Sequence, residues 1–158
     1  MAVVDITELA GALPSRTCLL GLDLGEKTIG VAVSDLSLTL ASPLELIRKT
    51  KFTVEAERLF KLMDERQAAG LVIGLPVNMD GSEGPRAQSC RAFARNLLRL
   101  KAVTIAFWDE RWSSAAMNRF LIEEADLSRA KRAEVIDRNA AAYILQGALD
   151  RIKGAADV

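Results

Sequence analysis

Short apolar runs alternate with longer amphipathic stretches along this chain. Runs rich in Leu, Val and Ile and bounded by turn residues are typical of buried strands. Five such runs predict strands: Cys18–Leu22, Ile29–Val33, Leu38–Ile47, Leu71–Gly74 and Val103–Trp108. The first two flank a tight connection and predict a hairpin, and Pro43 places the third at the edge of a sheet, where proline is tolerated.

The amphipathic stretches predict helices, because their apolar residues recur with the spacing of one helix face. Four follow the hairpin: Lys51–Ala69, Pro85 to about Lys101, a helix capped by Ser113 or Ser114 that ends near Ala125, and one capped by Ser128 that ends near Lys153. Gly70 suits the end of the first, and Pro85 suits the first turn of the second. Residues 75–86 form a long polar loop whose Asp80-Gly81 and Gly84-Pro85 pairs predict turns.

Three strands joined by short turns come first, and the later strands alternate with helices. This order predicts one mixed sheet covered by helices, an α/β fold. We expect a single domain over residues 17–153, with three antiparallel N-terminal strands and two further parallel strands. Residues 1–16 form an N-terminal leader, in which Ile6–Ala12 predicts a short helix that acts as a packing arm.

Composition narrows the chemistry. The 158 residues include 21 Lys and Arg and 21 Asp and Glu, so the formal net charge is zero and nucleic-acid binding has to come from local basic clusters. There is no histidine, which excludes Ser-His-Asp and Cys-His catalysis and leaves carboxylates to carry acid–base or metal chemistry. The two cysteines form no disulfide framework, and no apolar run is long enough to span a membrane. We expect a cytoplasmic protein without a secretory signal.

Three acidic positions stand out by context. Asp23 ends the first strand of the hairpin, and Asp109-Glu110 ends the last strand. Because parallel strands present their carboxyl ends at one edge of a sheet, these carboxylates converge if the two strands are parallel neighbours. Asp137 lies in a stripe of small apolar residues, where a carboxylate is costly unless it is paired or binds a cation. A turn aspartate at Asp23, and a salt bridge from Asp137 to Arg111 or Arg132, are the structural alternatives.

Carboxylates gathered at one edge repel each other, and divalent cations relieve that repulsion. Oxygen ligands without histidine favour Mg²⁺ or Mn²⁺ over zinc, and such ions support displacement at phosphorus. Basic residues suited to hold phosphates near this edge are Arg86, Arg111, Arg129, Lys131 and Arg132. A helical set, Arg91, Arg95 and Arg99, either does the same or only solvates a helix face. Aromatic residues are scarce, which favours recognition of backbone and shape over base stacking.

Four blocks of the sequence resemble the YqgF (RuvX) family, whose members are named as Holliday-junction resolvases and as pre-16S rRNA nucleases. The blocks read LGLDLGEKTIGVAVSD, GLPVNMDGSEGPRAQ, DERWSS and KRAEVIDRNAAAYIL, and the resemblance runs from about Leu19 to Asp150. It implies an RNase H-like fold and a metal-dependent endonuclease. Thr28, Trp112 and Ser114 depart from the family's usual basic residue, leucine and threonine, and none of these departures removes a carboxylate.

The resemblance also implies roles for individual residues. The metal ligands would be Asp23, Glu110 and Asp137. Glu110 is favoured over Asp109 because alternation along a strand would point the two side chains to opposite faces, and the choice stays open. The loop from Asn78 to Arg86 would line the substrate groove, with these two residues as phosphate contacts. The remaining substrate-binding candidates are Arg111, Lys131 and Arg132.

The leading hypothesis is a Mg²⁺- or Mn²⁺-dependent endonuclease that trims the 5′ end of precursor 16S rRNA, with the assembling ribosomal particle as its partner. Two alternatives remain: cleavage of branched DNA as a Holliday-junction resolvase, and a non-catalytic RNA-binding role in ribosome assembly. A nucleotide-binding phosphotransferase also opens with D-x-G in a hairpin but needs two such domains, and this chain has one copy. The sequence leaves the choice between a monomer and a homodimer open.

Overall fold

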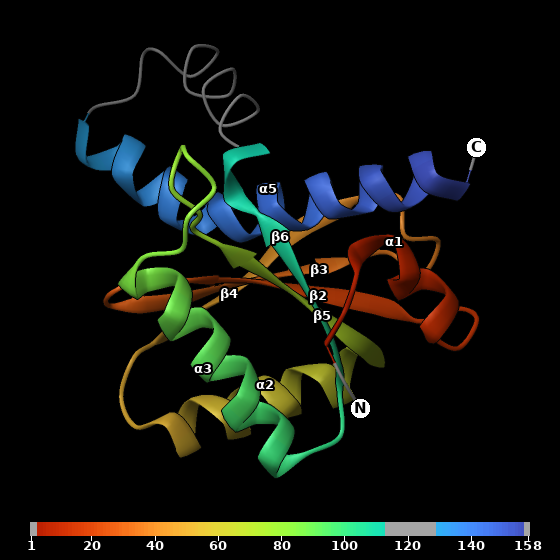
Figure 1. Cartoon of the computed structure of the whole chain (residues 1–158). Helices are drawn as coiled ribbons and strands as arrows, with labels where there is room; N and C mark the ends of the chain where they lie inside the picture. The colour runs from red at the N-terminus through yellow and green to blue at the C-terminus, as the bar shows by residue number, and fades with distance from the viewer. Residues whose placement is uncertain (1–2, 113–128, 157–158) are drawn as a thin grey trace.

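A six-stranded sheet forms the centre of the molecule, with α2 and α3 on one face and α1 and α5 on the other (Figure 1). The computed structural model describes residues 3–112 and 129–156, with side chains over residues 3–111 and 139–154. The strands are β1 Val3–Val4, β2 Cys18–Leu24, β3 Thr28–Ser34, β4 Ala41–Arg48, β5 Ala68–Leu75 and β6 Thr104–Asp109. The helices are α1 Ile6–Leu9, α2 Phe52–Arg66, α3 Pro85–Leu100 and α5 Arg129–Ala156, with short 3₁₀ helices η1 Ala10–Ala12 and η2 Glu110–Trp112.

The strand order in the sheet is β1-β6-β5-β2-β3-β4. β2, β3 and β4 are antiparallel neighbours, whereas β5 pairs in parallel with both β2 and β6. The mixed α/β fold predicted from the order of elements is therefore confirmed. Parallel pairing brings the carboxyl ends of β2, β5 and β6 together at one end of the sheet, which we call the carboxyl edge.

The sheet has six strands rather than the predicted five, because the N-terminal segment adds one. The two residues of β1 pair in parallel with Ile105 and Ala106 of β6. Two residues are too few to show a periodic pattern, so the sequence could not reveal this strand. The helix α1 that follows buries Ile6 and Leu9 in the same core as α5. Residues 3–12, expected to precede the domain as a leader, thus contribute to its sheet and core.

Alternation along β2 sends its side chains to two different cores. Leu20 and Leu22 belong to the cluster between the sheet and the α2–α3 layer. Gly21 faces α5 instead: a Cβ there would lie 2.7 Å from the Cβ of Leu145. α5 therefore packs directly against the backbone of β2. Asp23, two residues after Gly21, shares that face at the end of the strand.

The helix boundaries differ in detail from those predicted. α2 ends at Arg66 because Gln67 adopts a left-handed conformation, with φ 56°, and closes the last turn with its N–H. β5 then begins at Ala68 and is longer than the predicted Leu71–Gly74. The predicted helix that ends near Ala125 lies outside the described residues. No helix in the described ranges has the length and apolar character needed to cross a membrane.

Candidate active site

Two carboxylates meet at the carboxyl edge of the sheet. Asp23 lies one residue before the end of β2, and Glu110 directly follows β6 as the first residue of η2. β5 runs between these two strands and pairs in parallel with both. The strand order therefore brings the ends of β2 and β6, with Asp23 and Glu110, to the same edge of the sheet.

Gly74 on β5 makes room for the side chain of Glu110. A Cβ on this glycine would lie 2.7 Å from Glu110 Oε1 and 3.2 Å from its Cγ. It would also lie 2.5 Å from Ile144 Cδ1 of α5. The Glu110 side chain thus crosses the backbone of β5 on the face that α5 covers. No sequence motif distinguishes Gly74, although a glycine inside an apolar strand often indicates a close approach of another group to the backbone.

The electrostatics of Glu110 follow from this position. Burial and the neighbouring Asp23 raise the pKa of Glu110 from 4.5 to about 7, and Arg86 acts in the opposite direction. Both burial and a nearby like charge disfavour the ionised form of a carboxyl. A cation between the two carboxylates would offset both effects. The pair therefore fits a divalent metal ion that prefers carboxylate oxygens, such as Mg²⁺ or Mn²⁺.

The predicted third ligand, Asp137, belongs to the N-terminal half of α5. Its side chain lies outside the described ones, as do those of Lys131 and Arg132, so the roles of these three residues stay predictions. Among the side chains that are described, no group of three His, Cys, Asp or Glu residues could hold a metal ion. The described part of the site supplies two carboxylates, those of Asp23 and Glu110.

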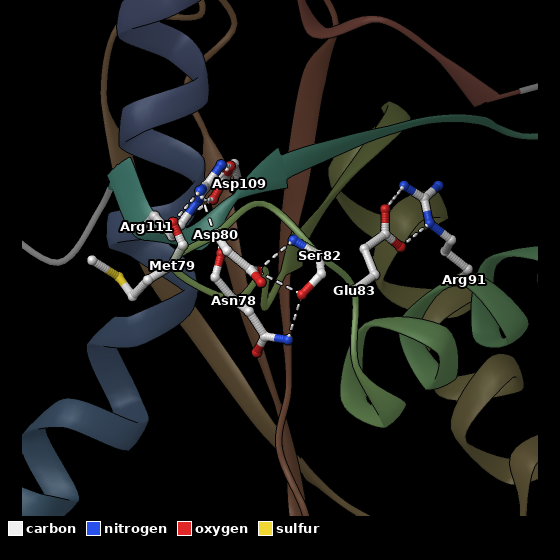
Figure 2. Close-up of polar contacts among 8 residues, drawn as sticks. All are labelled: Asn78, Met79, Asp80, Ser82, Glu83, Arg91, Asp109 and Arg111. Atoms are coloured by element: carbon white, nitrogen blue, oxygen red, sulfur yellow. Dashed lines mark hydrogen bonds and ion pairs between the residues drawn. The ribbon is translucent and has the colours of Figure 1, made fainter.

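Asp109, the other acid at the end of β6, has a different environment (Figure 2). The Arg111 guanidinium donates to both of its oxygens, from Nε at 3.0 Å and from Nη2 to Oδ2 at 2.6 Å. The backbone N–H of Arg111 donates to Oδ1 at 3.0 Å. These hydrogen bonds hold the pKa of Asp109 below its ordinary value. Asp109 is thus engaged with Arg111, whereas Glu110 lies over β5.

Arg111 also forms hydrogen bonds with the loop that precedes α3. Its Nη1 donates to the carbonyls of Asn78 and Met79, each at 3.3 Å. Within the loop, the Asn78 N–H donates to the Ser82 carbonyl at 2.9 Å, and Asn78 Nδ2 hydrogen-bonds Ser82 Oγ at 3.0 Å. Arg111 and Asn78, both predicted to contact substrate, therefore hold this loop in shape, and their contacts with substrate stay predictions.

A second ion pair closes the base of the same loop (Figure 2). Arg91 Nε and Nη2 donate to the two carboxylate oxygens of Glu83, at 2.5 and 2.7 Å. The Arg91 guanidinium also lies 4.9 Å from the centroid of the Phe107 ring. Arg91 therefore joins α3 to the loop and to β6, whereas Arg95 and Arg99 of the same predicted basic set are exposed.

A groove of about 180 Å³ opens at the carboxyl edge of the sheet, on the face covered by α2 and α3. It is formed by the β2–β3 turn, the segment between β4 and α2, and the start of α3. Arg86, predicted to contact phosphate, lines it together with Lys49, Ser89 and Cys90. Lys49 and Ser89 were not predicted from the sequence, because neither belongs to a motif that places it near the acids.

The sheet topology and the strand-end carboxylates define an RNase H-like fold. RuvC from Thermus thermophilus in complex with a Holliday junction substrate matches with a TM-score of 0.56 and 10% identity, covering 87% of this chain and 96% of that chain. The yeast mitochondrial Holliday junction resolvase matches with a TM-score of 0.54 and 10% identity, covering 96% of this chain and 86% of that chain. At such low identity these likenesses establish the fold alone.

Sequence comparison gives a closer relationship. A profile of the RuvX family, described as Holliday junction resolvase, matches residues 17–151. A relative from Phenylobacterium zucineum is 66% identical, covering 97% of this chain and 99% of the relative. One from Rhodospirillum rubrum is 60% identical, covering 96% of this chain and 94% of the relative. Both are named "Putative pre-16S rRNA nuclease". The chain belongs to the RuvX family, which confirms the resemblance found in its four sequence blocks.

Proposed function

We propose that this protein is a Mg²⁺- or Mn²⁺-dependent endonuclease that processes the 5′ end of precursor 16S rRNA during ribosome biogenesis. The observation that carries the proposal is the buried Glu110 carboxylate packed over Gly74 within the electrostatic influence of Asp23, where burial and repulsion favour a bound cation. Membership of the RuvX family and the names of its close relatives support the substrate. The proposal places the enzyme in the cytoplasm, where precursor rRNA is assembled into particles.

In this proposal the metal ligands are Asp23, Glu110 and Asp137. A bound divalent ion supplies an activated water and offsets negative charge on the scissile phosphate. Arg86, exposed at the start of α3, holds the substrate backbone beside the carboxylates. Lys131 and Arg132 of α5 contribute further backbone contacts. Asp109 acts indirectly, because through Arg111 it keeps the loop containing Asn78 at the rim of the site.

Cleavage of branched DNA is a second candidate, because the matching family profile is described as a Holliday junction resolvase. Both substrates present phosphodiesters, so the same carboxylates and basic residues would serve either. Resolution of a junction with two-fold symmetry calls for two active sites related by the same symmetry, and hence for a homodimer on the junction. Trimming of one RNA end requires one active site, and a monomer suffices.

Cleavage assays with both substrates test the proposal. A labelled precursor 16S rRNA 5′ leader, free and within the assembling particle, and a four-way DNA junction are each incubated with Mg²⁺, Mn²⁺ or EDTA. Asp23→Asn and Glu110→Gln are compared with Asp64→Asn, which removes an exposed carboxylate of α2. RNA cleavage that depends on metal, is lost in the first two variants and is retained in Asp64→Asn supports the proposal.

The other outcomes are equally informative. Cleavage of the DNA junction alone favours the second candidate. If folded wild-type protein binds the RNA but cuts neither substrate in any form, both nuclease candidates are wrong, and a non-catalytic RNA-binding role in ribosome assembly is favoured.

A further inference from the structure

The groove at the carboxyl edge includes cationic and hydroxyl side chains from separate elements. Lys49 directly follows β4, whereas Arg86 and Ser89 lie about one helical turn apart near the start of α3. Leu24, the neighbour of Asp23 on β2, forms part of the same wall. The groove therefore opens next to the strand end that carries the proposed metal ligand.

Lys49 and Arg86 differ from the ion-paired cations among the described residues. Arg58, Arg91 and Arg111 each form an ion pair with a carboxylate. Within the described residues, no ion pair includes Lys49 or Arg86. Their positive charges are thus available to an anion that enters the groove.

The buried thiol of Cys90 shows that these cations and the carboxylates share one neighbourhood. Burial and the charge of Glu110 raise the pKa of this thiol to about 11, and Asp23 acts in the same direction. Arg86 and Lys49 act in the opposite direction. Two negative and two positive side chains therefore lie close enough to influence the same sulfur atom. An anion bound by the cations would lie at the carboxyl edge on the face covered by α2 and α3, whereas Asp23 and Glu110 approach this edge from the α5 face.

Two glutamates also line the groove. Glu55 is 6% exposed and accepts a hydrogen bond from the Thr50 N–H at 2.9 Å, in the first turn of α2, where the helix dipole favours negative charge. Glu26 is exposed in the β2–β3 turn, where water and salt screen its charge. The backbone of Lys49 is held by the β2–β3 turn, because the Lys49 N–H donates to the Lys27 carbonyl at 3.0 Å. This hydrogen bond fixes the position of the Lys49 backbone, from which the side chain extends.

We propose that this groove is a second phosphate subsite, which holds a backbone phosphate of the cleaved strand near the phosphate at the carboxylates. Lys49 and Arg86 supply positive charge, and the Ser89 hydroxyl supplies a hydrogen-bond donor. The inference rests on the proposed nuclease function and deepens it. Because two phosphates held at once fix the register and direction of a strand, Lys49 is a positioning residue.

Binding in the absence of metal tests the subsite apart from catalysis. Wild-type protein, Lys49→Ala, Lys49→Arg and Ser89→Ala are titrated with the labelled single-stranded 5′ leader RNA in EDTA at several salt concentrations. Lys49→Ala should bind roughly five- to tenfold more weakly and lower the slope of log affinity against log salt by about 0.7. Ser89→Ala should bind about threefold more weakly with an unchanged slope. Lys49→Arg should keep the slope and most of the affinity.

A matched control and a position-specific readout separate the subsite from general attraction between charges. Lys61→Ala removes an exposed lysine of α2 that does not line the groove and should bind as wild type does. Neutral methylphosphonate linkages are then placed one at a time along the RNA. One linkage should weaken binding to wild-type protein but not to Lys49→Ala, since each change removes the same contact.

Three results would overturn the inference. Lys49→Ala could bind with the affinity and slope of wild type, the same linkages could matter equally in both proteins, or wild-type protein could show no salt-dependent RNA binding. Failure of the nuclease proposal looks different: wild-type protein then shows no metal-dependent cleavage, while the linkage that depends on Lys49 is still detected by binding. Cleavage with no contribution from Lys49 would leave the nuclease in place and remove the subsite.

Discussion

Two consecutive acids at the end of β6 have opposite surroundings. Hydrogen bonds from Arg111 lower the pKa of Asp109, whereas burial and Asp23 raise the pKa of Glu110 to about 7. Asp109 pairs with Arg111, which in turn holds the loop before α3. Glu110 instead packs against the backbone of Gly74. A carboxylate satisfied by its own chain contributes to structure. One whose ionised form is disfavoured by its neighbours indicates a place for a cation.

The largest expected difference between the two acids is in catalysis. Glu110→Gln, like Asp23→Asn, should lower metal-dependent cleavage by about a thousandfold or more, because the proposed ion loses a charged ligand. Asp109→Asn should lower it by about tenfold, because it only loosens the loop at the rim. Values of kcat and KM at saturating Mg²⁺ measure both effects, and circular dichroism checks folding. Equal losses in Glu110→Gln and Asp109→Asn would contradict the division of roles.

The packing of Glu110 over β5 makes Gly74 the next most sensitive position. Gly74→Ala should lower the free energy of unfolding by about 1–3 kcal/mol, because its Cβ would lie 2.5 Å from Ile144 Cδ1 and 2.7 Å from Glu110 Oε1. Urea denaturation measures the change. Gly154→Ala in α5 is the control: nothing lies within 4 Å of its added Cβ, so stability should be unchanged or rise by up to about 1 kcal/mol. A neutral Gly74→Ala would argue against this path for the Glu110 side chain.

The raised pKa of Glu110 predicts that metal-free protein loses stability as pH rises. Below about pH 4.5 this carboxyl is protonated in both folded and unfolded protein, and above pH 7 the folded state bears the full cost of its charge. The shift corresponds to about 3 kcal/mol at most, and solvent screening reduces this to about 1–2 kcal/mol. In EDTA, Glu110→Gln should therefore be more stable than wild type by that amount at pH 8 and equally stable at pH 4.

Metal addition provides the control for this pH effect. Mg²⁺ should raise the Tm of wild-type protein at pH 8 more than that of Glu110→Gln, because the cation offsets the charge that the variant lacks. A difference in stability between the two proteins that is constant from pH 4 to pH 8 would contradict the assigned pKa direction.

The smallest expected effect concerns Asp109, and it has the opposite dependence on pH. Asp109→Asn should lower the free energy of unfolding by about 1 kcal/mol at pH 7 and speed hydrogen exchange at the Ser82 amide. Because the pKa of Asp109 is lowered, its contribution is complete above the ordinary value of 3.8 and disappears as pH falls through the folded value. The gap between wild type and Asp109→Asn should thus close on acidification. A gap that widens at low pH would be inconsistent with the Arg111 pairing.

Sequence patterns revealed the strand ends but not which of two neighbouring acids lies over the sheet. Asp23 and Asp109-Glu110 follow apolar runs, so their places at the ends of strands could be predicted. Alternation favoured Glu110, but the choice depends on where η2 turns the chain and on the partner that Arg111 provides for Asp109. Such a partner depends on tertiary contacts that a local pattern does not contain.

Other features required the register of the sheet. In the sequence Gly74 is one residue of an apolar run. Its importance comes from the Glu110 side chain, which follows the neighbouring strand β6 and packs against this glycine. Lys49 is one of several exposed basic residues after an edge strand, and only the folded chain brings it to Arg86 and Ser89. β1 is too short to produce a pattern. Local periodicity therefore predicts elements, whereas contacts between distant elements define the groove.

The pairing of β1 with β6 also affects how the chain folds during synthesis. Residues 3–12 are synthesised well before the elements that receive them, β6 and α5. These residues therefore stay unpaired until β6 and α5 have been made, and contacts between such distant parts of a chain form slowly. A nascent chain that ends before α5 contains all six strands but cannot complete the core that α5 forms with α1. Closure of this side of the fold thus follows the synthesis of α5.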